Sequence, residues 1–171
     1  MNTEKIINHI CTWLNNYSNK STTNGFIIGI SGGIDSAVTS TLIAKTGKPV
    51  ICIEMPINQN KLQVERGKKH ISWLKKKFPN VSSIELDLTK VFTTFIKEAK
   101  KKHKTNKLAQ ANTRARLRMT TLYYFAQINN YLVVGTGNKV EDFGIGFFTK
   151  YGDGGVDISP IADLLKTEVF T

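Results

Sequence analysis

Residues 31–36, with the sequence Ser-Gly-Gly-Ile-Asp-Ser, place two adjacent glycines, two hydroxyls and one carboxylate in one short segment. The segment lies between an apolar run and a helical pattern, so its backbone amides and the start of the helix would form a nest for a phosphate group. A carboxylate beside a polyphosphate, such as Asp35, is chemically reasonable when Mg²⁺ lies between them. The alternative is a glycine-rich turn in which Asp35 caps the helix. The segment is not a Walker A loop, because no lysine follows the glycines, and it is not a GxGxxG loop.

Short apolar runs alternate with helical patterns along the chain, and this alternation predicts the elements that would position residues 31–36. Strands are expected at residues 26–30, 48–53, 83–86 and 131–134, and helices at residues 4–17, 35–45, 60–78, 88–101 and 109–128. This order is typical of an α/β fold, a doubly wound parallel sheet with helices on both faces. Ligands bind such sheets beyond the carboxyl ends of the strands, where residues 31–36 and a second polar segment at residues 135–141 would both lie.

The composition limits the class of protein. The chain has 171 residues, 40% hydrophobic and 22% charged, which is typical of a globular protein, and residues 1–171 are expected to form a single domain. No apolar run approaches the ~20 residues needed to cross a bilayer, and the N-terminus does not resemble a signal peptide, so a cytoplasmic location is expected. Cys11 and Cys52 lack the spacing of a metal site and are expected to be reduced thiols. Residues 144–155, which contain five glycines, are expected to form a mobile loop.

The charge is strongly positive, with 24 Lys and Arg against 13 Asp and Glu, a net charge of +11. Such an excess indicates a polyanionic partner, either a nucleic acid or a phosphorylated metabolite. It is equally compatible with a basic solvated surface, or with an acidic segment that is missing from the chain. The charge alone therefore does not choose a function.

Four segments together resemble one enzyme family. Residues 31–36 resemble the pyrophosphatase loop of ATP pyrophosphatases, which release pyrophosphate (PPi) and form an acyl- or imidoyl-adenylate. The other three segments are Asn-Thr-Arg-Ala-Arg-Leu-Arg-Met at residues 112–119, Gly-Thr-Gly-Asn-Lys-Val-Glu at 135–141 and Phe-Thr-Lys-Tyr-Gly-Asp-Gly-Gly-Val-Asp at 148–157. In this order they look like the ammonia-dependent NAD⁺ synthetases. The resemblance runs from about residue 25 to the end of the chain and implies the Rossmann-like, adenine-nucleotide α-hydrolase-like variant of the α/β fold.

The resemblance also implies roles for single residues. The ATP-binding residues would be Gly29, Ile30, Ser31, Gly32, Gly33, Ile34, Asp35, Ser36, Thr136 and Lys166. The Mg²⁺ ligands would be Asp35 and Glu141, and the residues that bind deamido-NAD⁺ would be Arg116, Lys150 and Asp157. Asp157 and Lys166 would be the catalytic residues, with Lys166 neutralising the departing PPi and Asp157 binding ammonium or accepting its proton. Arg114 and Arg118 are expected to be structural.

The implied reaction converts deamido-NAD⁺, ATP and ammonia into NAD⁺, AMP and PPi through an acyl-adenylate, the final step of NAD⁺ biosynthesis. The carboxylate of the substrate attacks the α-phosphorus, so no protein nucleophile is needed and catalysis rests on positioning and electrostatics. No glutaminase segment is found, and the nitrogen would come from free ammonia or a separate subunit. The family resemblance further implies a homodimer with sites at the subunit interface.

Two other functions remain open. A tRNA-modifying adenylyltransferase of the same group would suit the charge, but neither Cys11 nor Cys52 is placed as that class requires, and nucleic acid is disfavoured as a partner. A non-catalytic nucleotide-binding remnant is the other alternative, because the family usually continues for several dozen residues past the position of Thr171. The sequence departs from the family at Glu54, where some relatives carry an arginine near the adenine site.

Overall fold

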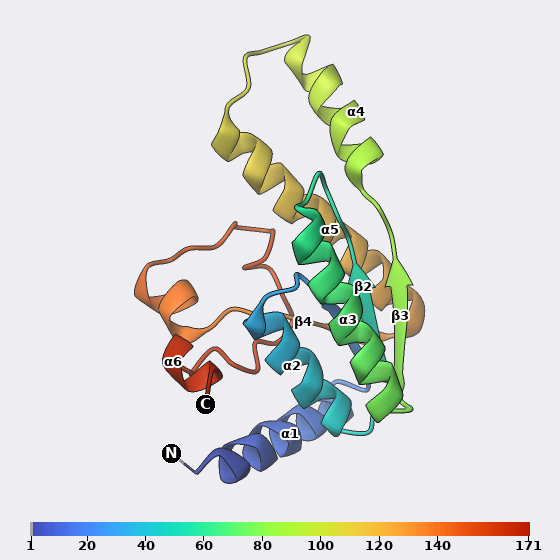
Figure 1. Ribbon diagram of the computed structural model, residues 1–171, viewed down its shortest axis with the longest axis vertical. Helices are drawn as coiled ribbons and strands as arrows, with labels where there is room; N and C mark the ends of the chain where they lie inside the picture. Colours follow the sequence, from blue (N-terminus) through green and yellow to red (C-terminus); the bar gives the residue numbers. More distant parts are fainter. Residues whose placement is uncertain (1) are drawn as a thin grey trace.

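The sheet of the computed structural model, which describes residues 2–171, is parallel throughout (Figure 1). Its strands are β1 (Gly25–Gly29), β2 (Val50–Glu54), β3 (Val81–Glu85) and β4 (Tyr131–Val134), in the spatial order β3-β2-β1-β4. The chain builds outward from β1 through β2 to β3 and then crosses to the other side of β1 for β4. The topology therefore switches direction between β1 and β4, which is where parallel α/β sheets bind their ligands.

Helices cover both faces of the sheet, as the sequence predicts (Figure 1). They are α1 (Thr3–Lys20), α2 (Ile34–Lys45), α3 (Lys61–Lys77), α4 (Thr89–Lys100), α5 (Lys107–Asn129) and α6 (Lys166–Val169), with a π-helical turn η1 (Val140–Gly144) after β4. Helices α1, α2, α3 and α6 pack on one face, and α4 and α5 on the other. No helix within residues 2–171 combines the length and the apolar character needed to cross a bilayer.

Strand β1 is apolar along its whole length because both of its faces are buried. Phe26 and Ile28 belong to the core beneath α1 and α2, whereas Ile27 belongs to the core beneath α5. All three side chains are fully buried. This double burial fixes the register of β1 and so fixes where residues 31–36 leave the sheet.

Asparagine side chains set several helix boundaries. Asn60 accepts a hydrogen bond from the amide of Leu62 at the start of α3, and Asn106 accepts one from the amide of Ala109 at the start of α5. Helix α5 ends at Asn129, and its C-cap residue Asn130 adopts the left-handed conformation with φ of 54°. The cap at Asn106 explains why α5 starts two residues before the predicted helix at 109.

Glu54, at the carboxyl end of β2, is a carboxylate within the core. It is 5% exposed, and its Oε1 has no hydrogen-bond partner within residues 2–171. The strand register places Glu85 directly beside it, while Lys68 of α3 bonds to Glu85 at 2.7 Å. Burial raises the pKa of Glu54; Lys68 partly offsets this effect and Glu85 adds to it.

We expect Glu54→Gln to stabilise the protein by about 1–2 kcal/mol at pH 8, because the cost of an unsatisfied buried charge is removed. When the pKa of a carboxyl is higher in the folded state than in the unfolded state, the free energy of unfolding of the protein falls as the pH rises from the unfolded pKa through the folded one. The advantage of the variant should therefore grow between pH 5 and pH 8 in urea unfolding. Glu98→Gln, at an exposed site paired with Lys101, is the matched control and should show no such trend. An advantage that is absent, or equal at both pH values, would contradict the expectation.

Candidate active site

A cavity of about 290 Å³ opens at the carboxyl ends of β1 and β4. Its polar side is formed by the two segments that leave these strands, with Ser31 after β1 and Thr136 after β4. Its apolar side is formed by Met55, Met119 and Leu122, the last two on α5. An apolar wall beside a polar rim suits a ligand with a flat base and a charged tail.

The loop at residues 31–36 is held in shape by its own side chains. Gly32 has φ of 78°, and a Cβ there would lie 2.3 Å from the carbonyl oxygen of Gln63, so no other residue fits. Ser36 is 2% exposed, and its hydroxyl donates to the carbonyl of Gly33 at 2.9 Å. The same hydroxyl accepts the amide of Ser31 at 3.3 Å. Ser36 therefore braces the loop from inside.

The loop leaves several amides free for an anion. Within residues 2–171, the amides of Gly32, Ile34, Asp35 and Ser36 have no protein acceptor. These amides lie at the start of α2, whose N-terminus carries positive partial charge. The N-cap of α2 is Gly33, so the alternative interpretation of Asp35 as the cap is wrong. The carboxylate of Asp35 instead accepts hydrogen bonds from the segment after β4 and from α6.

Asp35 and Glu141 meet at one cation, the ammonium group of Lys166. Its Nζ donates to Oδ2 of Asp35 and to Oε1 of Glu141, the latter at 3.2 Å. Burial lowers the pKa of Lys166, but the hydrogen bonds that it donates to both carboxylates, together with their negative charges, outweigh burial, and the pKa is raised overall. The structure thus brings together three residues that the sequence placed in one site, from α2, η1 and α6.

Asn138 connects the two carboxylates, and sequence analysis gave it no role. It is fully buried, and its Nδ2 donates to Oδ1 of Asp35 at 3.3 Å. Its Oδ1 accepts the amides of Val140 and Glu141 at 3.1 and 3.2 Å. It therefore fixes the start of η1, a π-helical turn of the kind often found at functional sites. A polar residue just past an apolar strand is the signal that could have identified it.

Arg116 and Lys150, both expected to bind deamido-NAD⁺, lie in contact. Nε of Arg116 donates to the backbone carbonyl of Lys150 at 3.1 Å, which ties the loop after η1 to α5. Residues 145–155 contain no helix or strand, whereas Gly144, the first residue of the loop predicted at 144–155, is the last residue of η1. The mobility of this loop stays a prediction. The ammonium group of Lys150 lies over the ring of Tyr151, with Nζ 5.1 Å from the ring centroid.

Asp157 is held separately, along the open edge of β4. Its Oδ2 accepts the amide of Val133 at 2.8 Å, and its Oδ1 accepts the hydroxyl of Tyr123 at 3.0 Å. Burial, with help from this bond to Asp157, raises the pKa of Tyr123 to about 12, so Tyr123 remains a donor. Among the described residues, no hydrogen bond links Asp157 to Asp35, Glu141 or Lys166.

Arg118 lines the cavity, although the sequence indicated only a structural role. Its Nε donates to the carbonyl of Met55 at 3.0 Å, and its Nη2 donates to Oε1 of Gln59 at 3.3 Å. Burial lowers its pKa from a very high ordinary value. Arg118 thus braces the segment after β2 and also presents positive charge to the cavity. Glu54 lies on the other face of β2, toward α3, so it takes no part in this cavity.

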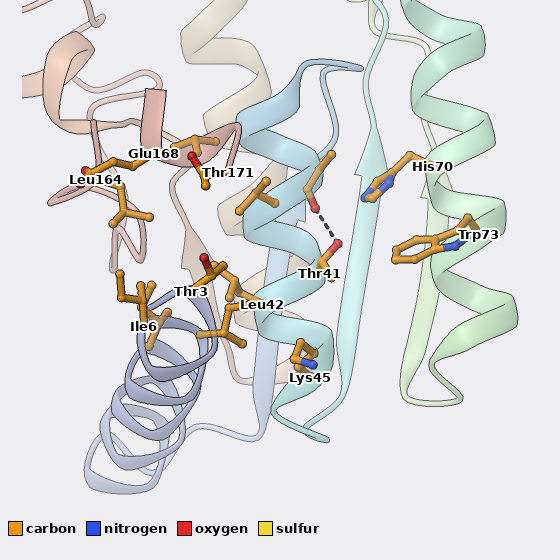
Figure 2. A pocket seen from close by; sticks show the side chains of 15 residues that line it. Thr3, Ile6, Thr41, Leu42, Lys45, His70, Trp73, Leu164, Glu168 and Thr171 are labelled. Carbon is orange, nitrogen blue, oxygen red and sulfur yellow. Dashed lines mark hydrogen bonds between the residues drawn. The ribbon is translucent and has the colours of Figure 1, made fainter. Parts of the chain in front are cut away.

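A larger cavity of about 460 Å³ lies elsewhere, among α1, α2, α3 and α6 (Figure 2). Its walls are mostly apolar, with Ile6 and Leu42 facing Leu164 across it. His70 at its rim shares a 2.8 Å hydrogen bond with Ser40, and burial lowers the pKa of its imidazole. Neither of the segments that leave β1 and β4 lines this cavity, whereas Ser31 and Thr136 of these segments line the smaller one, which is therefore the better candidate site.

Known proteins match this chain over almost its whole length. The family model described as NAD synthase matches residues 6–171. The NH(3)-dependent NAD(+) synthetase of Carboxydothermus hydrogenoformans is 42% identical over 171 residues, covering 98% of this chain and 66% of that protein. The chain thus spans about two thirds of the length of such curated relatives.

Two solved structures share the fold over 99% of the chain. The NMN synthetase from Francisella tularensis superposes with a TM-score of 0.91 at 33% identity, covering 68% of that protein. The NH3-dependent NAD synthetase from Campylobacter jejuni, in complex with the nitrate ion, superposes with a TM-score of 0.89 at 31% identity, covering 71% of that protein. By the match of its sequence to the family model and of its fold to these structures, the chain belongs to the NAD synthase family.

Proposed function

We propose that this protein is an ammonia-dependent ligase that converts deamido-NAD⁺, ATP and ammonia into NAD⁺, AMP and PPi. The observation that carries the proposal is the meeting of a phosphate nest and two carboxylates around one cation at the switch point of the sheet. Membership of the NAD synthase family supports it. The reaction would be the last step of NAD⁺ biosynthesis.

Asp35 and Glu141 are fit to hold Mg²⁺. Both offer carboxylate oxygens, which Mg²⁺ prefers, and both already face one positive charge, that of Lys166. When bound, Mg²⁺ would offset negative charge on the triphosphate.

The other residues would bind and orient the two nucleotides. The free amides of residues 32–36 would hold the ATP phosphates, with Thr136 as a further contact and Lys166 at the departing PPi. The base of ATP would lie against Met55, Met119 and Leu122. Arg116 and Lys150 would bind the anionic groups of deamido-NAD⁺. Such positioning, together with electrostatic stabilisation, supplies most of the catalysis of phosphoryl-type transfers.

The chemistry would proceed in two displacements. A carboxylate oxygen of the nicotinate ring attacks the α-phosphorus of ATP, the bond from that phosphorus to the β-phosphate oxygen breaks, and PPi leaves with the electron pair. Ammonia then adds to the carbonyl carbon of the acyl-adenylate, the carbon–oxygen bond breaks, and AMP leaves. The added nitrogen loses one proton to Asp157 or to water. The hydrogen bonds that fix the carboxylate of Asp157, from the Tyr123 hydroxyl and the Val133 amide, support this role.

A second candidate substrate follows from the similarity to the NMN synthetase of Francisella tularensis. NMN is a nicotinamide mononucleotide, so the corresponding acid would be nicotinate mononucleotide. The same phosphate nest and carboxylate pair would serve either acid, because these two features would bind ATP, which both reactions consume. The two candidate substrates differ only in that deamido-NAD⁺ carries an additional AMP half, which nicotinate mononucleotide lacks.

The test is to mix the protein with Mg-ATP, ammonium and either acid and to identify the products. We expect NAD⁺, AMP and PPi in equal amounts, with the dinucleotide preferred. Formation of ADP would contradict the reaction, and preference for the mononucleotide would contradict the substrate. ATP binding without PPi release would indicate a nucleotide-binding remnant, and tight, salt-sensitive tRNA binding would indicate the tRNA-modifying class.

We further propose that the protein is a homodimer whose sites lie at the interface. Tyr124 and Ile128, one turn apart on α5, are 64% and 62% exposed, and such adjacent apolar side chains favour an interface. Sedimentation equilibrium at micromolar concentration should give about twice the 19.1 kDa chain mass. Ile128→Lys should shift the protein toward the monomer, whereas Leu62→Lys, at an exposed position of α3, should not. A monomeric wild-type protein would contradict the proposal.

A further inference from the structure

We infer that Asn138 is a positioning residue that sets the spacing of Asp35 and Glu141 and thereby the affinity of this pair for a divalent cation. The inference rests on the proposed function, because it concerns the proposed metal ligands. It assigns to Asn138 no contact with substrate.

The side chain of Asn138 is bonded at both ends to the two ligand-bearing segments. Its amide nitrogen donates to the carboxylate of Asp35 on α2, and its amide oxygen accepts the amide of Glu141 on η1. A buried amide costs free energy unless both ends are bonded, so these bonds hold the side chain in one orientation. Asp35 and Asn138 are 103 residues apart in the chain, and this bond is a direct link between them.

Two carboxylates that share one cation need such a link. Like charges at about 4 Å repel by ~1 kcal/mol in water and by more inside a protein, so the pair tends to separate when the cation leaves. Lys166 has a long, flexible side chain and cannot fix a distance. Asn138 has a short side chain that donates to one carboxylate and anchors the backbone of the other. The pair is therefore preorganised before a divalent cation arrives.

Asn80 provides a matched control. It too is an asparagine whose side chain braces the backbone, donating to the carbonyls of Ala44 and Lys48 at 3.0 and 2.7 Å. It lies before β3, and it does not line the candidate site. Asn80→Ala should lower stability without changing cation binding.

The test is Mn²⁺ binding followed by electron paramagnetic resonance, in the presence of α,β-methylene-ATP so that no turnover occurs. We expect Asn138→Ala to weaken Mn²⁺ binding about tenfold, the lower end of what residues behind metal ligands contribute. Asn138→Ser keeps a hydroxyl that can cap η1 but is too short to reach Asp35, so it should fold and show the same weakening. In turnover, the Mg²⁺ concentration for half-maximal rate should rise by a similar factor while the KM for deamido-NAD⁺ stays constant.

Equal Mn²⁺ affinity in the wild-type protein and Asn138→Ser would overturn the inference, and so would equal weakening by Asn80→Ala. A wild-type protein that binds no Mn²⁺ with the nucleotide analogue would overturn it as well. Because binding is measured without turnover, a protein that binds Mn²⁺ but makes no NAD⁺ would contradict the proposed function alone. The two failures are thus distinguishable.

Discussion

Replacing Asp35 by asparagine is expected to lower the rate of PPi release at least about a thousandfold, because an isosteric amide removes the negative charge that faces Lys166 and would hold Mg²⁺. The fold should persist, since Asn keeps an oxygen that accepts the hydrogen bond from Asn138. Release of PPi from saturating Mg-ATP measures the effect, and circular dichroism checks the fold. Asp163→Asn, at an exposed position, is the matched control and should keep full activity. A folded Asp35→Asn variant with a tenth of wild-type activity would show that Asp35 is not a metal ligand.

Lys166→Met should lower the same rate by about a hundredfold to a thousandfold, because methionine keeps the apolar stem and loses the charge beside the departing PPi. Mn²⁺ binding should not weaken, since an ammonium group that contacts both carboxylates is removed from competition. These two readouts separate Lys166, which would act on the leaving group, from Asn138, which would act on the cation.

The control for Lys166 is Lys68→Met. Lys68 also pairs with a glutamate, Glu85 at 2.7 Å, but lies on α3 away from the cavity. Its loss should leave PPi release unchanged and stability nearly so, because exposed ion pairs contribute little. Equal losses of activity in Lys166→Met and Lys68→Met would mean that net charge matters and position does not.

The fold was predictable because its signals are local. The apolar run of β1 reflects burial on both faces, and residues 31–36 follow it directly in the chain. The predicted start of strand β3, residue 83, is two residues late, because Ser82 and Ser83 interrupt the alternation of apolar and polar residues on this edge strand. The single-domain assignment stays a prediction.

The site was only partly predictable because its contacts join distant segments. The motifs named Asp35, Glu141 and Lys166, but the cation that the two carboxylates share appears only when η1 and α6 fold beside α2. Asn138 and Arg118 act through partners more than fifty residues away, which residue type and spacing do not reveal. Glu54 was noted as a departure from the family, but its burial toward α3 depends on the packing of β2 and α3.

Part of the excess charge now has a structural explanation. Lys75, Lys76 and Lys77 occupy the last turn of α3, and Lys97 and Lys100 occupy the last turn of α4. Cations there interact favourably with the negative end of a helix. These lysines therefore require no polyanionic partner, whereas Arg118 and Lys166 belong to the candidate site.

An isotope experiment tests most directly whether the acid is activated as an acyl-adenylate. Deamido-NAD⁺ labelled with oxygen-18 in the nicotinate carboxylate is converted with Mg-ATP and ammonium, and the products are analysed by mass spectrometry. Attack of the carboxylate on the α-phosphorus predicts one labelled oxygen in AMP and none in PPi. Label in inorganic phosphate accompanied by ADP, or unlabelled AMP formed together with NAD⁺, would contradict the account.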